Sequence, residues 1–268
     1  MAGTQTQNGY VPVGDLSMYY EIHGEGRPLV VLHGAYMTVD STGPIVPGLA
    51  ATRQVIALEM QGHGRTADID RPISYDQMAE DTAAAVRQLG IENADLFGYS
   101  MGGAIALLVA IRHPELVRKL VVASTGYDSE GFSPEAREMF PTITPELFKG
   151  TPIEEEYLRV SPTPDHFDQF VEKMVALDTQ RFVVPEDDVR GIAAPTFIVL
   201  GDSDGVVLDH AIEFFKLRGG GVMGDLAGMP ASQLAILPGT SHFVPPGSGL
   251  MDRVDWLLAM IPPFLDAD

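Results

Sequence analysis

Unbroken runs of four apolar residues recur along this chain of 268 residues. They are Leu29–Leu32, Val55–Leu58, Leu120–Ala123, Phe197–Leu200 and Leu234–Leu237. Runs without polar alternation are typical of strands that are buried on both faces of a parallel sheet. Helical patterns lie between several of these runs, and one of them covers Tyr75–Leu89 and stops at Gly90. Strands that alternate with helices predict an α/β fold, with a mostly parallel central sheet flanked by helices.

Two segments depart from this alternation. Tyr10–Ile22 alternates weakly around a turn at Gly14, which predicts an N-terminal hairpin. Residues 127–184 contain several prolines and short amphipathic segments but no clear strand run. A segment of this length between two core strands is too long for a simple loop, so we predict a helical insertion there. The remaining residues, 1–126 and 185–268, are predicted to form one core domain.

The composition narrows the class of partner. The formal net charge of −20 opposes binding to nucleic acid and to anionic membranes. We therefore expect a small-molecule partner, and the sequence leaves a homodimer open. The chain has no cysteine, which excludes disulfides, thiolate nucleophiles and cysteine metal sites. It has no apolar run of about eighteen residues that could span a membrane. Residues 1–8 lack the pattern of a signal peptide, so a cytoplasmic location is expected.

Two pentapeptides match the pattern G-x-S-x-G, and their contexts differ. Ser100, in Gly98–Gly102, follows a short strand pattern and precedes an apolar helical pattern. Strand, sharp turn and helix form the context of a nucleophile elbow, in which a strained turn exposes the serine hydroxyl. Ser203, in Gly201–Gly205, lies between two carboxylates whose charges would oppose an oxyanion. Ser100 is therefore the predicted nucleophile, and the second match is predicted to be the loop that supplies a catalytic acid.

A serine nucleophile needs a base, and the base needs a group that orients it. In a parallel sheet, catalytic groups collect on loops at the carboxyl ends of strands, and His33, His63 and His242 meet that condition. His33 and His63 precede the nucleophile and are each followed by glycine, which favours a structural role for both. His242 follows the last strand pattern and is the predicted base. Asp204 follows the strand run Phe197–Leu200 by a short turn and is the predicted acid, with its neighbour Asp202 as the competitor.

Taken in order, these motifs resemble an α/β-hydrolase-fold serine hydrolase. The resemblance rests on the sequences Leu32–Ala35, Gly62–Gly64, Gly98–Gly103, Gly201–Asp204 and Gly239–His242. It implies that Asp204 closes a Gly-x-x-Asp loop and that His242 closes a Gly-x-x-His loop. It further implies an oxyanion hole formed by the backbone N–H groups of Ala35 and Met101. The helical insertion at 127–184 would then be a cap over the site.

The function expected from this reasoning is hydrolysis of a short or medium acyl ester, or of a lactone, through an acyl-enzyme. Carbon–carbon hydrolysis, acyl transfer and perhydrolysis use the same three residues, because fold does not select the reaction. A ligand-binding receptor or pseudo-enzyme stays open as another class. The expected substrate contacts are Tyr36, Phe140 and Phe243, and further apolar candidates are Met139, Phe148, Phe167, Phe170 and Met174. No metal or other cofactor is expected, since the histidines lack metal-ligand spacing.

Overall fold

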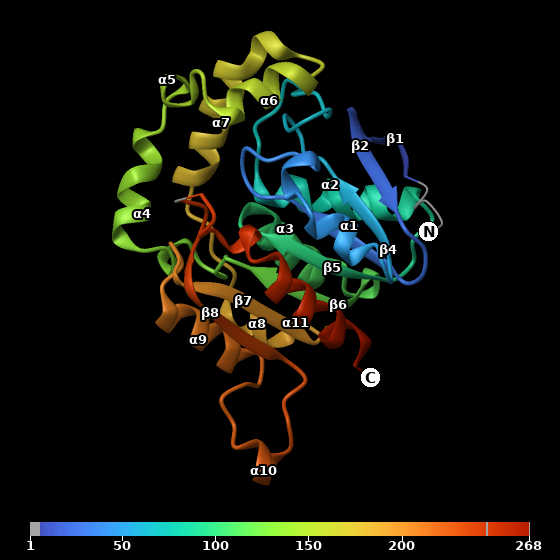
Figure 1. Ribbon diagram of the computed structural model, residues 1–268, viewed down its shortest axis with the longest axis vertical. Helices are drawn as coiled ribbons and strands as arrows, with labels where there is room; N and C mark the ends of the chain where they lie inside the picture. Colours follow the sequence, from blue (N-terminus) through green and yellow to red (C-terminus); the bar gives the residue numbers. More distant parts are fainter. Residues whose placement is uncertain (1–5, 245, 268) are drawn as a thin grey trace.

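An eight-stranded sheet forms the centre of the computed structural model, which describes residues 6–244 and 246–267 (Figure 1). The strands lie in the order β1-β2-β4-β3-β5-β6-β7-β8. Their bounds are β1 Gln7–Val13, β2 Leu16–His23, β3 Pro28–Leu32, β4 Gln54–Leu58, β5 Ala94–Tyr99, β6 Val117–Ala123, β7 Thr196–Ser203 and β8 Gln233–Ser241. Each of the five apolar runs lies within a strand, so the predicted α/β fold with a mostly parallel sheet is confirmed.

The sheet is antiparallel at one edge and parallel elsewhere. β1 and β2 form an antiparallel hairpin that turns at Gly14, whose φ of 57° suits glycine. β2 also pairs antiparallel with β4, whereas every pair from β4 through β3 to β8 is parallel. The carboxyl ends of the parallel strands therefore meet at a single edge of the sheet, where ligand sites of open α/β sheets are found.

Helices cover both faces of the sheet (Figure 1). On one face, α2 Tyr75–Gln88, α3 Met101–Arg112, α8 Glu186–Gly191 and α9 Leu208–Leu217 share one buried apolar cluster with the strands. On the other face, α1 Ile45–Leu49 and α11 Val254–Asp266 share a second cluster. α2 begins as the sequence predicts, because the Ser74 hydroxyl accepts a hydrogen bond from the Gln77 N–H at 3.2 Å.

The segment between β6 and β7 is helical. Its helices are α4 Pro134–Met139, α5 Pro145–Phe148, α6 Pro152–Val160 and α7 Phe167–Thr179, followed by α8. Figure 1 shows α4 to α7 together at one end of the molecule, far from α10 Gly224–Ala227. The two ends of the segment meet, since Asp128 and Val183 form an antiparallel bridge and the Val184 N–H donates to the Tyr127 carbonyl at 2.8 Å. The segment therefore leaves the core and returns to it at adjacent positions.

Short 3-10 helices of three residues each lie between the longer elements. They are Asp40–Thr42, Pro114–Leu116, Ser129–Gly131, Phe140–Thr142, Pro164–His166 and Leu250–Asp252. In the part of the chain that the structure describes, no helix is both long and apolar enough to cross a bilayer.

Candidate active site

Ser100 lies at the sharp turn between β5 and α3, with φ 53° and ψ −116°. The left-handed φ is unusual for a residue other than glycine and is typical of strained functional positions. The turn requires glycine on both sides. A Cβ at Gly98 would lie 2.1 Å from the Gly102 carbonyl oxygen, and a Cβ at Gly102 would lie 2.2 Å from the Leu32 carbonyl oxygen. The strand–turn–helix context predicted from the pentapeptide is therefore present around Ser100.

The three residues Ser100, His242 and Asp204 lie in one chain of hydrogen bonds. Nε2 of His242 lies 2.9 Å from Oγ of Ser100, and Nδ1 of His242 lies 2.7 Å from Oδ1 of Asp204. A carboxylate only accepts hydrogen bonds, so Nδ1 carries the proton and the free Nε2 can accept from the serine hydroxyl. This geometry allows the imidazole to take the proton of Ser100 as that hydroxyl attacks.

Asp204 is held as a buried anion. Its side chain is fully buried and accepts hydrogen bonds from Ser124 Oγ at 2.6 Å, from the Val206 N–H at 3.1 Å and from the Gly201 N–H at 3.4 Å. Burial alone would raise its pKa, but the hydrogen bond and charge of His242 and the further donors together lower the pKa below the usual 3.8. Ser124 was not predicted. The available signal was its position directly after the strand run Leu120–Ala123.

Asp202 makes no hydrogen bond or ion pair with His242 and instead binds backbone N–H groups of β8. Its carboxylate accepts hydrogen bonds from the Gly239 N–H at 3.0 Å and the Thr240 N–H at 3.2 Å, and these lower its pKa. It thereby ties the end of β7 to the end of β8, directly before His242. Ser203 Oγ donates to Asp202 at 3.2 Å, and Ser203 belongs to β7, so this second pentapeptide is no strand-to-helix turn.

Ala35 and Met101 both line the space in front of Ser100. Within the described residues, the backbone N–H of neither residue has a hydrogen-bond acceptor. The next residue, Tyr36, has a φ of 61°. A left-handed residue at this point bends the loop that follows β3. The two predicted oxyanion donors therefore lie at one cavity with their N–H groups unused.

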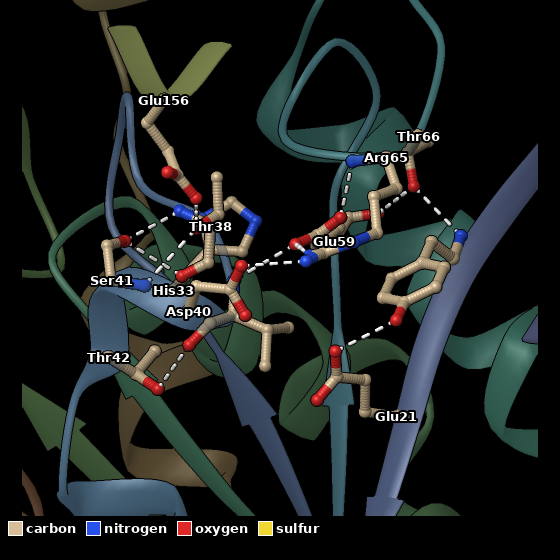
Figure 2. Close-up of polar contacts among 12 residues, drawn as sticks. Glu21, His33, Thr38, Asp40, Ser41, Thr42, Glu59, Arg65, Thr66 and Glu156 are labelled. Carbon is tan, nitrogen blue, oxygen red and sulfur yellow. Dashed lines mark hydrogen bonds and ion pairs between the residues drawn. The ribbon is translucent and has the colours of Figure 1, made fainter. Parts of the chain in front are cut away.

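A buried acid supports the loop that carries Ala35 (Figure 2). The side chain of Glu59 is fully buried. It accepts a hydrogen bond from the Val39 N–H at 3.0 Å and forms an ion pair with Arg65 at 2.9 Å. Burial raises the pKa of Glu59, and the hydrogen bonds from the Arg65 and Val39 N–H groups oppose that shift. The Thr38 hydroxyl donates to Glu156 of α6 at 3.2 Å, so the same loop also contacts the helical segment. Sequence reasoning missed Glu59, which simply follows the run Val55–Leu58.

His33 and His63 have structural contacts, in line with the structural role expected for both. Nδ1 of His33 donates to the Gly34 carbonyl at 2.8 Å, and its Nε2 accepts from the Met60 N–H at 3.1 Å. Burial lowers the pKa of His33 to about 4, so the ring is neutral at pH 7. His63 donates to the Gln61 carbonyl at 3.0 Å, and burial also lowers its pKa. The centroids of the two rings lie 4.9 Å apart, and the rings support the loops after β3 and β4.

A cavity of about 910 Å³ opens in front of Ser100 and His242. The three expected substrate contacts, Tyr36, Phe140 and Phe243, all line it. Of the further apolar candidates, Met139 and Phe148 also line it. Phe167, Phe170 and Met174 do not line it, because their side chains are buried in the packing between α7 and the core. Among the described residues, no group of three or more histidine or acidic side chains is placed to hold a metal ion.

The comparison with known proteins agrees with this architecture. Residues 27–181, more than half of the chain, match the family model described as the alpha/beta hydrolase fold. The chain therefore belongs to the α/β-hydrolase fold family, as its motifs predicted, and this is a superfamily of hydrolytic enzymes.

Individual relatives differ in the compounds for which they are named. The chain is 30% identical to the 2-hydroxymuconate semialdehyde hydrolase of Pseudomonas sp. strain CF600, over 69% of this chain and 72% of that protein. It is 33% identical to a protein of Azorhizobium caulinodans provisionally named a carbamate hydrolase, over 57% of this chain and only 56% of that relative. The solved structure of 2-hydroxy-6-oxo-6-phenylhexa-2,4-dienoate hydrolase from Rhodococcus sp. strain RHA1 superimposes with a TM-score of 0.76. That match covers 98% of this chain and all of the other at 20% identity, which shows a shared fold.

Proposed function

We propose that this protein is a serine hydrolase that cleaves a carboxylic ester, either a short or medium acyl ester or a lactone, through an acyl-enzyme. The observation that carries the proposal is the pair of contacts made by His242, 2.9 Å to Ser100 Oγ and 2.7 Å to Asp204 Oδ1. A serine hydroxyl is too weak an acid to attack a carbonyl unaided, and this arrangement supplies both the base and the group that orients the base.

In the proposed reaction, Ser100 Oγ attacks the ester carbonyl carbon while Nε2 of His242 takes the hydroxyl proton. The negative charge on the carbonyl oxygen is stabilised by the N–H groups of Ala35 and Met101, which are free to donate to it. Asp204 stabilises the imidazolium that forms. The imidazolium then protonates the departing alcohol oxygen as the carbon–oxygen bond breaks. Water, deprotonated by His242, then attacks the carbonyl carbon of the acyl-enzyme and forms a second tetrahedral intermediate. As the bond between that carbon and Ser100 Oγ breaks, His242 returns its proton to Oγ. The acid is released and the Ser100 hydroxyl is restored.

We further propose that residues 127–184 act as a cap over this reaction. Phe140, Phe148 and Leu177 of this segment form part of the cavity wall, which supports the proposal. A cavity with mostly apolar walls and few polar groups suits the acyl or alcohol part of an ester. Excluding water there strengthens the interactions of the oxyanion with its donors.

Carbon–carbon hydrolysis is the second candidate, because the Pseudomonas relative is named for a muconate semialdehyde, a compound without an ester group. Acyl transfer and perhydrolysis differ only in the nucleophile that receives the acyl group. A ligand-binding receptor or pseudo-enzyme is the candidate of another class, and it predicts tight binding without turnover.

A fluorophosphonate probe and a substrate panel test the proposal together. The adduct is expected on Ser100, absent in Ser100→Ala and retained in Ser203→Ala, which is the matched control for the second pentapeptide. p-Nitrophenyl acetate, butyrate and octanoate and a set of lactones should be hydrolysed by the wild type and not by Ser100→Ala. Labelling elsewhere would refute the nucleophile. Turnover of a 2-hydroxy-6-oxodienoate without turnover of esters or lactones would replace the ester proposal with the second candidate.

A further inference from the structure

One carboxylate in the cavity has no task in the proposed reaction. Asp178 lies in the last turn of α7 and lines the same cavity as Ser100. It is partly buried, and it makes no hydrogen bond or ion pair with any residue that the structure describes. Glu156 also lines the cavity but is occupied by Thr38 and Arg159. The remaining charged side chains of the lining, apart from His242, are those of Glu130, Arg137 and Arg181, and all three are exposed.

Two tyrosines line the same cavity as Asp178. Tyr36 and Tyr75 line the cavity, and their rings are backed by Phe148 at 4.8 Å and Phe182 at 4.9 Å between ring centroids. Burial raises the pKa of both tyrosine hydroxyls, and the negative charge of Asp178 raises both pKa values further. The Tyr36 hydroxyl is itself buried without a hydrogen-bond partner among the described residues.

The electrostatics of this region favour a positive charge. Burial raises the pKa of Asp178 to about 7, and no cation among the described residues compensates its charge. The carboxylate also lies at the C-terminal end of a helix, where the macrodipole favours cations. Aromatic faces attract alkylammonium groups, most strongly where water is excluded. The net charge of −20 raises the local concentration of cationic ligands around the whole molecule.

We propose that Asp178, together with the rings of Tyr36 and Tyr75, binds the ammonium group of a cationic ester whose carbonyl lies at Ser100. The proposal rests on the proposed ester hydrolase function and narrows its substrate class to esters that carry a quaternary or protonated amine away from the bond that is cleaved. No covalent step changes, since Asp178 acts only by binding the charged end of the substrate. It is a specificity-determining residue.

Matched substrates isolate this charge. We would compare p-nitrophenyl esters whose acyl chains end in trimethylammonium with esters of the same chain length that end in tert-butyl, with three to six methylenes between the carbonyl and that group. The two end groups have nearly the same shape and differ by one positive charge. In the wild type, kcat/KM for the best cationic ester should exceed that of its neutral partner by about tenfold or more. The preference should appear mainly in KM, because the end group is remote from the reacting atoms.

Three variants separate a local contact from a general charge effect. Asp178→Asn should abolish the preference while retaining hydrolysis of the neutral esters. Asp178→Glu keeps the charge and should retain a preference, with the optimum moved to a shorter chain. Asp168→Asn removes the same charge from the exposed first turn of α7, outside the cavity lining, and should leave the preference unchanged. A wild-type preference that persists in Asp178→Asn would overturn the proposal.

A binding measurement distinguishes failure of this proposal from failure of the ester hydrolase function. Butyltrimethylammonium should bind the Ser100→Ala protein by calorimetry, and the added Asp178→Asn substitution should weaken binding about tenfold or more. Asp178-dependent binding without hydrolysis of any ester would retain the cation site and refute the hydrolase function. Hydrolysis of neutral esters, with neither cation preference nor cation binding that depends on Asp178, would refute the cation site alone.

Discussion

The contact between α3 and the end of β3 makes Gly102 sensitive to any added side chain. A Cβ there would lie 2.2 Å from the Leu32 carbonyl oxygen and 2.6 Å from the His33 carbonyl oxygen. Real Cβ atoms essentially never approach closer than 3.0 Å, so Gly102→Ala needs a shift of at least 3.0 − 2.2 = 0.8 Å between two backbone segments. Overpacking typically costs about 1–3 kcal/mol. Replacing glycine by alanine within a helix recovers up to about 1 kcal/mol. Because backbone atoms yield poorly, we expect a net loss of about 2 kcal/mol.

The same shift would impair activity. β3 leads directly to Ala35 and α3 begins at Met101, so the displacement moves the two oxyanion donors relative to each other. A misplacement of about 1 Å at an active site costs on the order of a hundredfold in rate. Urea unfolding measures the stability, and the rate at which a fluorophosphonate labels Ser100 in the folded protein measures the activity of the site.

Two matched glycine substitutions calibrate the result. A Cβ at Gly103 would lie 2.6 Å from Thr125 Cγ2, a side-chain atom that can move, so Gly103→Ala should cost about 1 kcal/mol and slow labelling less than tenfold. A Cβ at Gly191, at the end of α8, would meet no neighbouring atom of the described residues within 4 Å, so Gly191→Ala should leave stability unchanged or raise it slightly. If Gly102→Ala were as stable and as reactive as Gly191→Ala, the steric reasoning for the elbow would be refuted.

Three more expectations concern the acid of the site. Asp204→Asn should lower kcat by about 10⁴, because an amide cannot hold the imidazole in the same tautomer. Asp202→Asn should lower kcat by less than about tenfold. Steady-state assays on p-nitrophenyl butyrate measure both, and equal losses in the two variants would contradict the assignment of Asp204 as the acid. Ser124→Ala removes a short hydrogen bond to Asp204, so it should raise the pKa of Asp204 and lower kcat by about tenfold, measured as a pH profile of kcat against wild type. The pKa of folded Asp204 lies below its ordinary value of 3.8, so its stabilising contribution is complete above that pH and is lost as pH falls through the lowered folded pKa. The difference in unfolding free energy between wild type and Asp204→Asn should therefore be constant near neutral pH and shrink below about pH 4, and a difference that grew on acidification would have the wrong sign.

Much of the fold could be predicted because its signals are local. The apolar runs, such as Leu29–Leu32 and Phe197–Leu200, are short segments that are stable when both faces are covered, and four of the five became buried strands inside the sheet. The run Leu234–Leu237 instead lies in the edge strand β8, where Ile236 is exposed. The glycines around Ser100 likewise carry their own steric reason. In contrast, the sequence patterns did not separate apolar residues of the insertion that line the cavity from those that pack beneath it. Phe148 and Phe170 are both aromatic residues of the insertion, and only the tertiary packing decides that Phe148 lines the cavity while Phe170 is buried against the core.

The amino-acid sequence alone determined the order of strands and helices, the position of the elbow and the three residues that could meet at one edge of a parallel sheet. The tertiary structure showed that the predicted Asp204, and not its competitor Asp202, is hydrogen-bonded to His242. It alone showed that Ser124 and Glu59 support the site, and that Asp178 lines the cavity without a hydrogen-bond or ion-pair partner among the described residues. The physical reason is a difference in range. Periodicity and turn chemistry act between neighbours in the chain, whereas a hydrogen bond or an uncompensated charge depends on the placement, to within about an ångström, of groups that the chain brings together from far apart.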